Sequence, residues 1–374
     1  MSTAVTTRDV PFFNYRGAFG AIEVPLMETI TDVIHRGAFI MQKDLTEFER
    51  AIASYLGVKH ALGVGNATDG LYFAFKAAGL QPRDEVIFPS HTMVAGPAAV
   101  HFAGGIPVPI DIGSDHLMDA SKIEAAITKK TRFIMPTQLN GRTCDMDAIQ
   151  AVAVKHGLRI IEDAAQALGS QFRGRYAGTF GVAASFSFYP AKVLGSLGDG
   201  GLVVTDDDAV ADRISQLRDH GRDLKGEVVG WGMNSRLDNL QAAVLQLQFR
   251  DYAAIIAHRR RLAATYHEEL GSLREVTLPP APGADTRHVD IYQNFEIEAE
   301  RRDALKGFLK ERGIGTLIQW GGKAVHQVAA LGLTASLPVT ERFFEFCLML
   351  PMNMMVSVED VGYVAKAIRA FYRG

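Results

Sequence analysis

The sequence predicts an α/β protein with a large domain, built on a mostly parallel sheet covered by helices, and a small C-terminal α+β domain. A chain of 374 residues that is 48% hydrophobic can bury a large core and exceeds the usual size of one compact domain. Short apolar runs alternate with helical patterns through its first half, which is typical of parallel sheets. The pattern changes near Arg236, and we expect the large domain to span residues 1–250 and the small domain residues 251–374.

The predicted large domain begins with an irregular arm over residues 10–20, followed by helical patterns over residues 25–34 and 45–56. Seven apolar runs then predict strands: Ala61–Val64, Glu85–Pro89, Ile106–Ile112, Arg132–Pro136, Arg159–Asp163, Val182–Phe188 and Gly201–Thr205. Helical patterns separate most of them: Thr68–Ala78, Val94–Ala103, Ala120–Ile127, Met146–His156 and Ala209–Leu217. Ligand sites in such folds lie beyond the strand ends, so we expect functional residues there.

The predicted small domain follows one long helical stretch, Leu237–Leu270, which Gly271 ends. The proline-rich residues 278–283 then break the chain. The remaining patterns predict a strand at 294–297, a helix at 302–311, a strand near 316–319 and a last helix at 358–372.

Charge and composition exclude several classes of protein. The 39 basic and 42 acidic residues give a net charge of −3, and the short run Arg259–Arg261 is interpreted as a solvated helix face, so nucleic acid is not an expected partner. Cys144 and Cys347 are too few and too distant for a disulfide framework or a metal cage. The polar opening, residues 1–10, lacks the apolar core of a signal peptide, and no apolar run reaches membrane-spanning length. We therefore expect a soluble cytoplasmic protein that binds no metal.

Lys192 follows the predicted strand Val182–Phe188, on the turn that leads to the glycine pair Gly200 and Gly201. A partly buried lysine has a lowered pKa and can form an imine with a carbonyl compound, and pyridoxal phosphate is the obvious carbonyl partner. In isolation, a surface lysine that closes a strand is the commoner interpretation.

Two further segments carry candidate chemistry. At residues 63–71 a predicted strand passes through small residues directly into a helix, where Thr68 and free backbone amides could bind a phosphate. N-capping by Asn66 or Thr68 explains this segment equally well. The strand Arg159–Asp163 ends in Glu162 and Asp163, which must point to opposite faces. Asp163 lies nearest the strand end and could keep a pyridine nitrogen protonated, although an aspartate there is more often a helix cap.

Five segments together resemble the DegT/DnrJ/EryC1/StrS aminotransferases: Asn66–Leu71, Glu162–Ala167, Phe186–Lys192, Gly200–Gly201 and Gly232–Leu237. The resemblance covers residues 12–372 with the motifs in the family order. It implies a fold-type-I transferase with a seven-stranded sheet, which uses pyridoxal 5'-phosphate and acts on keto sugars, usually nucleotide-linked.

The resemblance also implies residue roles. Lys192 corresponds to the lysine that binds the cofactor and moves the proton, and Asp163 to the partner of the pyridine nitrogen. Gln166 corresponds to the amide beside the ring hydroxyl. The phosphate contacts would come from Ala67, Thr68, Ser187 and, across a homodimer interface that completes each site, Asn234.

Three segments depart from the family pattern. Met93 replaces the aromatic residue that usually stacks on the cofactor, and its thioether could still pack there, in a contact worth about 0.3–1.5 kcal/mol. Residues 138–141 read Gln-Leu-Asn-Gly where His-Leu-Tyr-Gly is common. Residues 319–327 replace the usual His-Tyr-Pro segment; Trp320, Lys323 and His326 could bind sugar or diphosphate, or could have core and surface roles.

The sequence thus predicts an aminotransferase of amino-sugar biosynthesis that passes an amino group from an amino acid, expected to be glutamate, to a nucleotide-linked 4-keto or 3-keto deoxy sugar. Two alternatives share the fold. A pyridoxamine-dependent sugar dehydratase resembles a branch in which histidine replaces the lysine, so Lys192 argues against it. Retention of Lys192, Asp163, Gln166 and Ser187 argues against a non-catalytic regulator.

Overall fold

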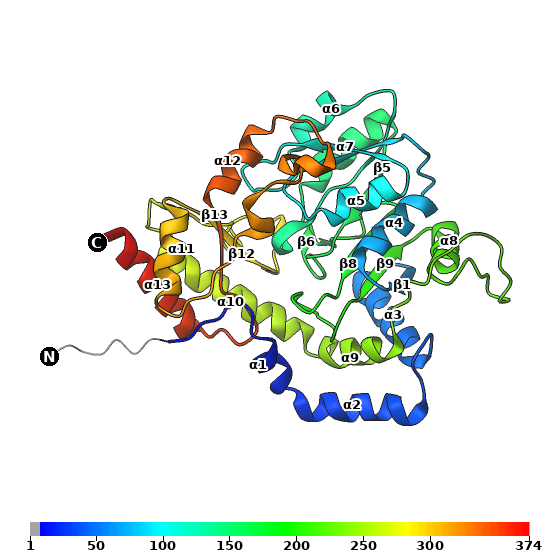
Figure 1. The fold of residues 1–374 in the computed structure, drawn as a ribbon, viewed down its shortest axis with the longest axis horizontal. Coiled ribbons are helices and arrows are strands. Elements are labelled where there is room, and N and C mark those ends of the chain that lie inside the picture. The colour runs from blue at the N-terminus through cyan, green and yellow to red at the C-terminus, as the bar shows by residue number, and fades with distance from the viewer. Residues whose placement is uncertain (1–7, 374) are drawn as a thin grey trace.

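The computed structural model describes residues 8–373, so most of the polar opening lies outside the described residues. The largest sheet has seven strands, in the order β1-β9-β8-β5-β4-β2-β3. Figure 1 labels four of these strands, β1, β5, β8 and β9. The strands are β1 (His60–Val64), β2 (Glu85–Pro89), β3 (Ile106–Ile110), β4 (Thr131–Ile134), β5 (Arg159–Asp163), β8 (Ala183–Ser187) and β9 (Gly201–Thr205). Only β9 runs antiparallel to its neighbours, β1 and β8. The predicted fold class and the seven predicted strands are confirmed, with ends shifted by one or two residues.

Helices cover both faces of this sheet because both faces of its strands are apolar. On one face, side chains such as Phe88 and Ile161 pack against α4 (Ala67–Ala77), α5 (Ala95–Phe102) and α8 (Asp208–Arg218). On the other face, Ile134 packs with α7 (Met146–His156), and Leu202 with α3 (Lys43–Leu56) and α9 (Asn239–Phe249). Shorter elements of this part are α6 (Ile123–Ala126), η1 (Ala120–Lys122), η2 (Leu139–Gly141), β6 (Gln171–Phe172) and β7 (Arg175–Tyr176).

A second core lies around a three-stranded sheet in the order β10-β12-β13. Its strands are β10 (Val276–Thr277), β12 (Phe295–Ala299) and β13 (Cys347–Leu350), and its helices are α10 (Tyr252–Leu270), α11 (Arg302–Lys310) and α13 (Val358–Arg373). Val10, from the N-terminal arm, is buried in the same core, and its backbone pairs with Ile314. Beyond the arm lie α1 (Tyr15–Gly20) and α2 (Glu23–Arg36), the latter against α9.

Three expectations about the second half were wrong. The stretch 237–270 forms two helices, α9 and α10, which are separated at Arg250–Asp251. Tyr252, at the start of α10, still packs in the core of the large sheet, and α10 reaches the second core only from Leu262. Residues 316–319 form no regular strand: Leu317 pairs with Met349 as a single bridge, and the strand beside β12 is β13. Arg259 is not on a solvated face but is buried, at 5% exposure.

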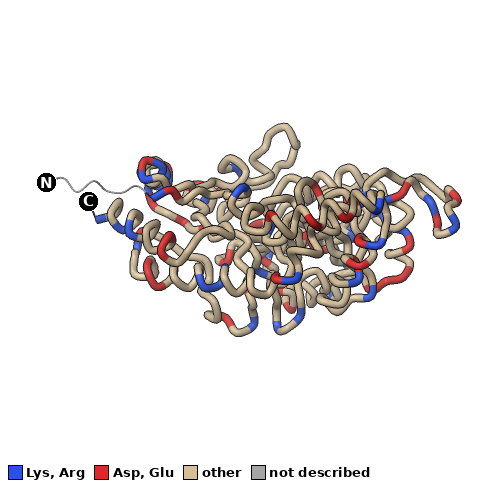
Figure 2. Tube along the Cα trace, turned by 90° about the horizontal axis from the view of Figure 1, so that it is seen from below, with Lys and Arg blue, Asp and Glu red and all other residues tan. Residues whose placement is uncertain are grey.

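The remaining elements are β11 (His288–Val289), which pairs with β6, the short helices η3 (Gln319–Gly322), η4 (Val325–Gln327) and η5 (Ala329–Leu331), and α12 (Pro338–Phe346). Figure 2 shows that basic and acidic residues are interspersed along the described chain. Among the described helices, none has the length and apolar character needed to cross a membrane.

Candidate active site

An open cavity of about 360 Å³ lies where β2, β4, β5 and β8 end, next to the first residues of α4. It brings together seven of the eight residues predicted to bind or activate a cofactor: Ala67, Thr68, Met93, Asp163, Gln166, Ser187 and Lys192. The sequence interpretation missed other lining residues, among them Thr92, Thr137, Tyr189 and Asp199. Tyr189 and Asp199 adjoin the quoted motifs, so their proximity to Lys192 was the available signal.

Lys192 lies on a tight turn at the cavity wall. Its backbone N–H donates to the carbonyl oxygen of Tyr189 at 2.8 Å, and Ser196 closes the turn through a bond to the carbonyl oxygen of Phe188. A side chain at Gly195 would place its Cβ atom 2.7 Å from the carbonyl oxygen of Pro190, so only glycine fits this turn. Burial lowers the pKa of the Lys192 ammonium to about 8, although the nearby Asp163 carboxylate opposes the change. The side chain is therefore available as a neutral amine in mildly alkaline solution.

Glu162 and Asp163 point to opposite faces of the sheet, as the strand geometry predicted. The Glu162 carboxylate is buried and accepts hydrogen bonds from the backbone N–H groups of Gly178, Phe180 and Gly181 at 2.6–2.9 Å. Asp163 faces the cavity and accepts a bond from the N–H of Ala165 at 3.2 Å. Burial raises the pKa of Asp163, and the Ala165 N–H and the Lys192 charge only partly oppose that rise. Glu162 is thus a structural acceptor, whereas Asp163 is a carboxylate open to a ligand.

The N-terminus of α4 combines a cap with free donors. Asn66 caps the helix, since its Oδ1 accepts a bond from the N–H of Asp69 at 2.9 Å. The N–H groups of Ala67 and Thr68 begin the helix and have no intrahelical acceptor, and both residues line the cavity. Close packing fixes this end, because a Cβ atom at Gly201 would come within 2.5 Å of the Asn66 carbonyl carbon. The capping role therefore belongs to Asn66, and the anion-binding donors belong to the residues after it.

The orientation of the Gln166 amide follows from its partners. Its Oε1 accepts a bond from the backbone N–H of Asn140 at 2.9 Å, and that group can only donate. The Nε2 end of Gln166, a donor, is therefore left for the cavity. Asn140 has a left-handed backbone, with φ of 55°, which asparagine tolerates better than most residues.

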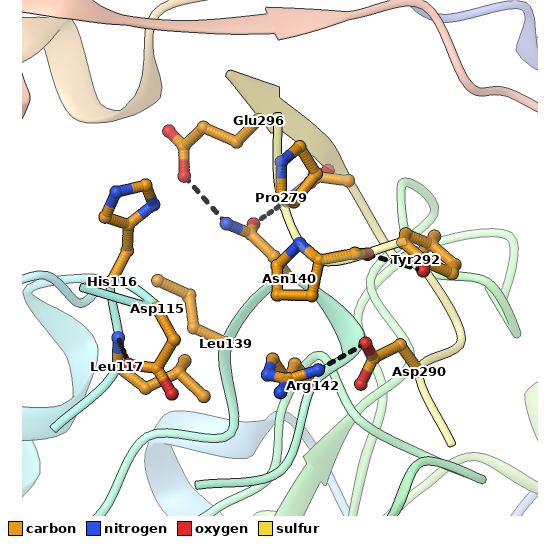
Figure 3. A pocket seen from close by; sticks show the side chains of 12 residues that line it. Asp115, His116, Leu117, Leu139, Asn140, Arg142, Pro279, Asp290, Tyr292 and Glu296 are labelled. Atoms are coloured by element: carbon orange, nitrogen blue, oxygen red, sulfur yellow. Dashed lines mark hydrogen bonds and ion pairs between the residues drawn. The ribbon is translucent and has the colours of Figure 1, made fainter. Parts of the chain in front are cut away.

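Asn140 also lies beside a second, smaller cavity, shown in Figure 3. Its Nδ2 donates to Glu296 at 2.7 Å, and Arg142 pairs with Asp290 at 2.5 Å in the same view. Gln319 joins this network through bonds of 3.0 Å to Asn140 and 2.9 Å to Glu296. Two of the segments that depart from the family pattern, 138–141 and 319–327, are thus hydrogen-bonded to each other.

The other residues that depart from the family pattern lie in different environments. Met93 lines the main cavity and is 51% exposed. His326 is buried between Ser90 and Glu341, at 2.7 and 3.2 Å, which indicates a structural role. Trp320 packs edge-on against His91, with ring centroids 5.5 Å apart. The side chain of Lys323 is exposed and lies outside the main cavity.

Asn234 is the one predicted cofactor contact that the cavity does not include. It is exposed, and its backbone pairs with Asp219. The next residue, Ser235, is buried, and its Oγ accepts a bond from the N–H of Gly65 at 3.1 Å.

The cavity residues fit pyridoxal phosphate. Asp163, a buried acid, and Lys192, a half-buried lysine, line one cavity without forming an ion pair in the described structure. Donors for a phosphate stand at the α4 end of the same cavity, where Ala67, Thr68 and Ser187 gather. Acid, amine and phosphate donors match the three polar ends of this cofactor.

Comparison with known proteins agrees with this fit. The model of the DegT/DnrJ/EryC1/StrS aminotransferase family matches residues 21–369. The chain is 38% identical to the dTDP-3-amino-3,4,6-trideoxy-alpha-D-glucose transaminase of Streptomyces venezuelae, over 99% of this chain and 98% of the relative. It is 37% identical to the UDP-N-acetyl-3-dehydro-alpha-D-glucosamine 3-aminotransferase of Acidithiobacillus ferrooxidans, over 98% of each chain. The crystal structure of S. venezuelae DesV in complex with a ketimine intermediate superposes with a TM-score of 0.94 at 37% identity, covering 98% of this chain and 100% of that one.

Proposed function

Because the chain belongs to the DegT/DnrJ/EryC1/StrS aminotransferase family, we propose that it transfers an amino group from glutamate to a nucleotide-linked keto sugar. Enzymes of this family and fold are pyridoxal-phosphate-dependent sugar aminotransferases. The observation that supports the proposal most directly is the convergence of Lys192, Asp163 and the phosphate donors of α4 on one cavity.

Each residue of the cavity has a proposed role toward the cofactor. The amine of Lys192 would hold the cofactor and, once released from it, would carry the proton that leaves the donor's α-carbon and later reaches the acceptor's carbon. The Asp163 carboxylate would accept a hydrogen bond from the pyridine N–H, and Gln166 would donate to the ring hydroxyl through Nε2. Met93 would pack on the ring face. When bound, the cofactor serves as the electron sink for the removal of that proton.

Within one chain, three donors would hold the phosphate in this proposal. The N–H groups of Ala67 and Thr68 point from the positive end of α4, and Ser187 adds a hydroxyl from the end of β8. Since α4 is 11 residues long and its cap, Asn66, is bonded within the helix, these donors are fixed before the ligand arrives. The phosphate thus anchors the ring, while Lys192 and Asp163 act on its other ends.

We propose a 3-keto nucleotide sugar as the acceptor, because the two relatives compared above are named for amination at carbon 3. Unstable keto sugars can be avoided by running the reaction in reverse. Purified enzyme with 2-oxoglutarate should convert 3-amino dTDP or UDP sugars to keto sugars and release glutamate, measured by mass spectrometry. Conversion of 4-amino sugars alone would contradict amination at carbon 3. Conversion of free amino sugars without the nucleotide would contradict a nucleotide-linked substrate.

We further propose a cytoplasmic homodimer in which Asn234 reaches the phosphate in the partner's cavity. The exposed position of Asn234, outside its own cavity, supports this arrangement. The test combines two inactive variants, Lys192→Ala and Asn234→Ala, which are unfolded together and refolded as mixed dimers. If Asn234 serves the partner, a mixed dimer has one doubly damaged site and one intact site, so activity should return.

The control for this experiment refolds each variant alone, which should stay inactive. Native mass spectrometry reports the fraction of mixed dimers. A mixture that contains mixed dimers and yet stays inactive would place Asn234 in its own chain's site and end the shared-site proposal.

A further inference from the structure

The side chain of Gln293 holds the peptide groups on both sides of Lys192. Its Nε2 donates to the carbonyl oxygen of Ala191 at 2.8 Å, and its Oε1 accepts a bond from the N–H of Val193, also at 2.8 Å. A carbonyl can only accept and a backbone N–H can only donate, so these partners fix the orientation of the amide. Gln293 comes from the segment before β12, about a hundred residues further along the chain, and is 7% exposed.

The backbone that carries Gln293 is itself held from two sides. Arg259, on α10, donates from Nε to the carbonyl oxygen of Tyr292 at 2.8 Å and from a terminal nitrogen to that of Gln293 at 2.7 Å. On the other side, the N–H of Ile291 donates to the carbonyl oxygen of Gly141 at 2.9 Å. Arg259 is buried, so these bonds are shielded from water. The position of the Gln293 amide is therefore set by α10 and by the turn after β4.

Asn294, the residue after Gln293, lies beside Gln166, the other side chain proposed to face the cofactor. The Nδ2 of Asn294 donates to the Oδ1 of Asn140 at 2.8 Å and lies 3.3 Å from the Oε1 of Gln166. Gln293 thus holds the peptide groups beside Lys192, and the next residue, Asn294, contacts the Asn140 side chain and Gln166.

We propose that Gln293 is the positioning residue for the amine of Lys192, an inference that rests on the proposed role of this lysine. A lysine that must meet a fixed carbonyl group needs a fixed backbone, since an error of about 1 Å in a reacting group can cost roughly 100-fold in rate. Removing the Gln293 amide would also leave two peptide groups without partners, so the turn would relax toward solvent. The amine of Lys192 would then be less buried and would titrate closer to the pH of an ordinary lysine.

The proposed experiment measures the amine itself, without cofactor. Cyanate carbamylates the neutral form of an amine, and mass spectrometry of the Lys192 peptide from cofactor-free protein gives the labelling rate against pH. In the wild type this rate should rise with a midpoint near pH 8, because burial lowers the pKa to about 8. In Gln293→Met the midpoint should move up by on the order of one pH unit, toward the ordinary lysine value. The titratable groups that share the cavity, Asp163, Tyr189 and Asp199, are unchanged in every variant.

Gln248→Met is the matched control. The Gln248 amide donates at 2.8 Å to the carbonyl oxygen of Gly195, in the same turn, but does not bracket Lys192. This variant should lose thermal stability as Gln293→Met does, while its labelling midpoint stays near that of the wild type. A second variant, Gln293→Asn, keeps an uncharged amide but is one methylene shorter, so it cannot hold both peptide groups, and should give a smaller shift.

The outcomes test the positioning role of Gln293 separately from the proposed cofactor-binding role of Lys192. If both Gln293 variants label with the wild-type midpoint, Gln293 is not a positioning residue, whatever happens to stability. If Gln293→Met does not fold, the Gln293→Asn profile decides in the same way. Because cyanate labelling needs no cofactor or substrate, these results stand even if a borohydride test shows that another lysine holds the cofactor.

Discussion

Lys192→Ala is expected to lose amino transfer by roughly 10⁴- to 10⁶-fold, the scale seen when the group that bonds covalently to a substrate is removed from an enzyme. Among the residues that the structure describes, no lysine besides Lys192 lines the cavity, so we expect no neighbouring amine to replace it. The change removes a side chain from an open cavity, and the turn keeps its backbone bonds to Tyr189 and Phe188. Folding should therefore survive, and the loss should be chemical.

The measurement has two parts. Purified wild type should absorb visible light through its bound cofactor, and sodium borohydride should join the cofactor covalently to the peptide that contains Lys192. Lys192→Ala should show neither result. Lys155→Ala is the control, because Lys155 is exposed and pairs with Glu124 on the surface. Covalent cofactor on any peptide other than that of Lys192 would refute the assignment.

Much of this site could be predicted from local sequence. Lys192, Asp163, Ser187 and the start of α4 follow strands that alternate apolar residues with helices, and the ends of parallel strands meet at one edge of a sheet. The opposite orientation of Glu162 and Asp163 followed from the period of a strand. These residues line the cavity because of where their own strand or helix ends, which is information that the neighbouring sequence carries.

The supports of the site could not be predicted in the same way. Gln293 bonds to Ala191, and Asn140 bonds to Glu296 and Asn294, all partners more than a hundred positions away in the chain. Nothing in the neighbouring sequence indicates these partners. Arg259 was misinterpreted because a run of three arginines on a helix is usually solvated, whereas here backbone carbonyl oxygens satisfy the buried guanidinium. The break between α9 and α10 was missed since apolar spacing continues across it, and α9 and the first turns of α10 pack in the same core.

Asp163→Asn is expected to slow removal of the donor's α-proton by on the order of 10²- to 10³-fold or more, the scale of losing a preorganised electrostatic group. An amide cannot hold a proton on the pyridine nitrogen, so the ring would become a poorer electron sink. The rate is measured directly by the exchange of the glutamate α-proton with deuterated solvent, followed by NMR. Turnover close to that of the wild type would mean that Asp163 is only a core or capping residue.

Although Asp163→Asn should slow the reaction, it should not destabilise the cofactor-free protein. Burial raises the pKa of Asp163 above its unfolded value, so the folded state binds more protons than the unfolded state between those two pKa values. Stability from this group is therefore lost as the pH rises through that window, and above it the charged carboxylate disfavours folding. Asp163→Asn removes the charge, and its unfolding temperature at neutral pH should equal or exceed that of the wild type.

Glu162→Gln provides the matched control, since the two carboxylates are adjacent in sequence but face opposite sides of the sheet. Both oxygens of Glu162 accept backbone N–H groups, from Gly178, Phe180 and Gly181. A glutamine would turn an NH₂ group toward two donors in either orientation, the N–H groups of Phe180 and Gly181 or those of Gly178 and the Gln138 amide, and would cost about 1–3 kcal/mol for each unsatisfied group. This variant should lose stability yet keep the rate of α-proton exchange in the molecules that remain folded. The reverse result, with exchange lost in Glu162→Gln and kept in Asp163→Asn, would exchange the roles of the two residues.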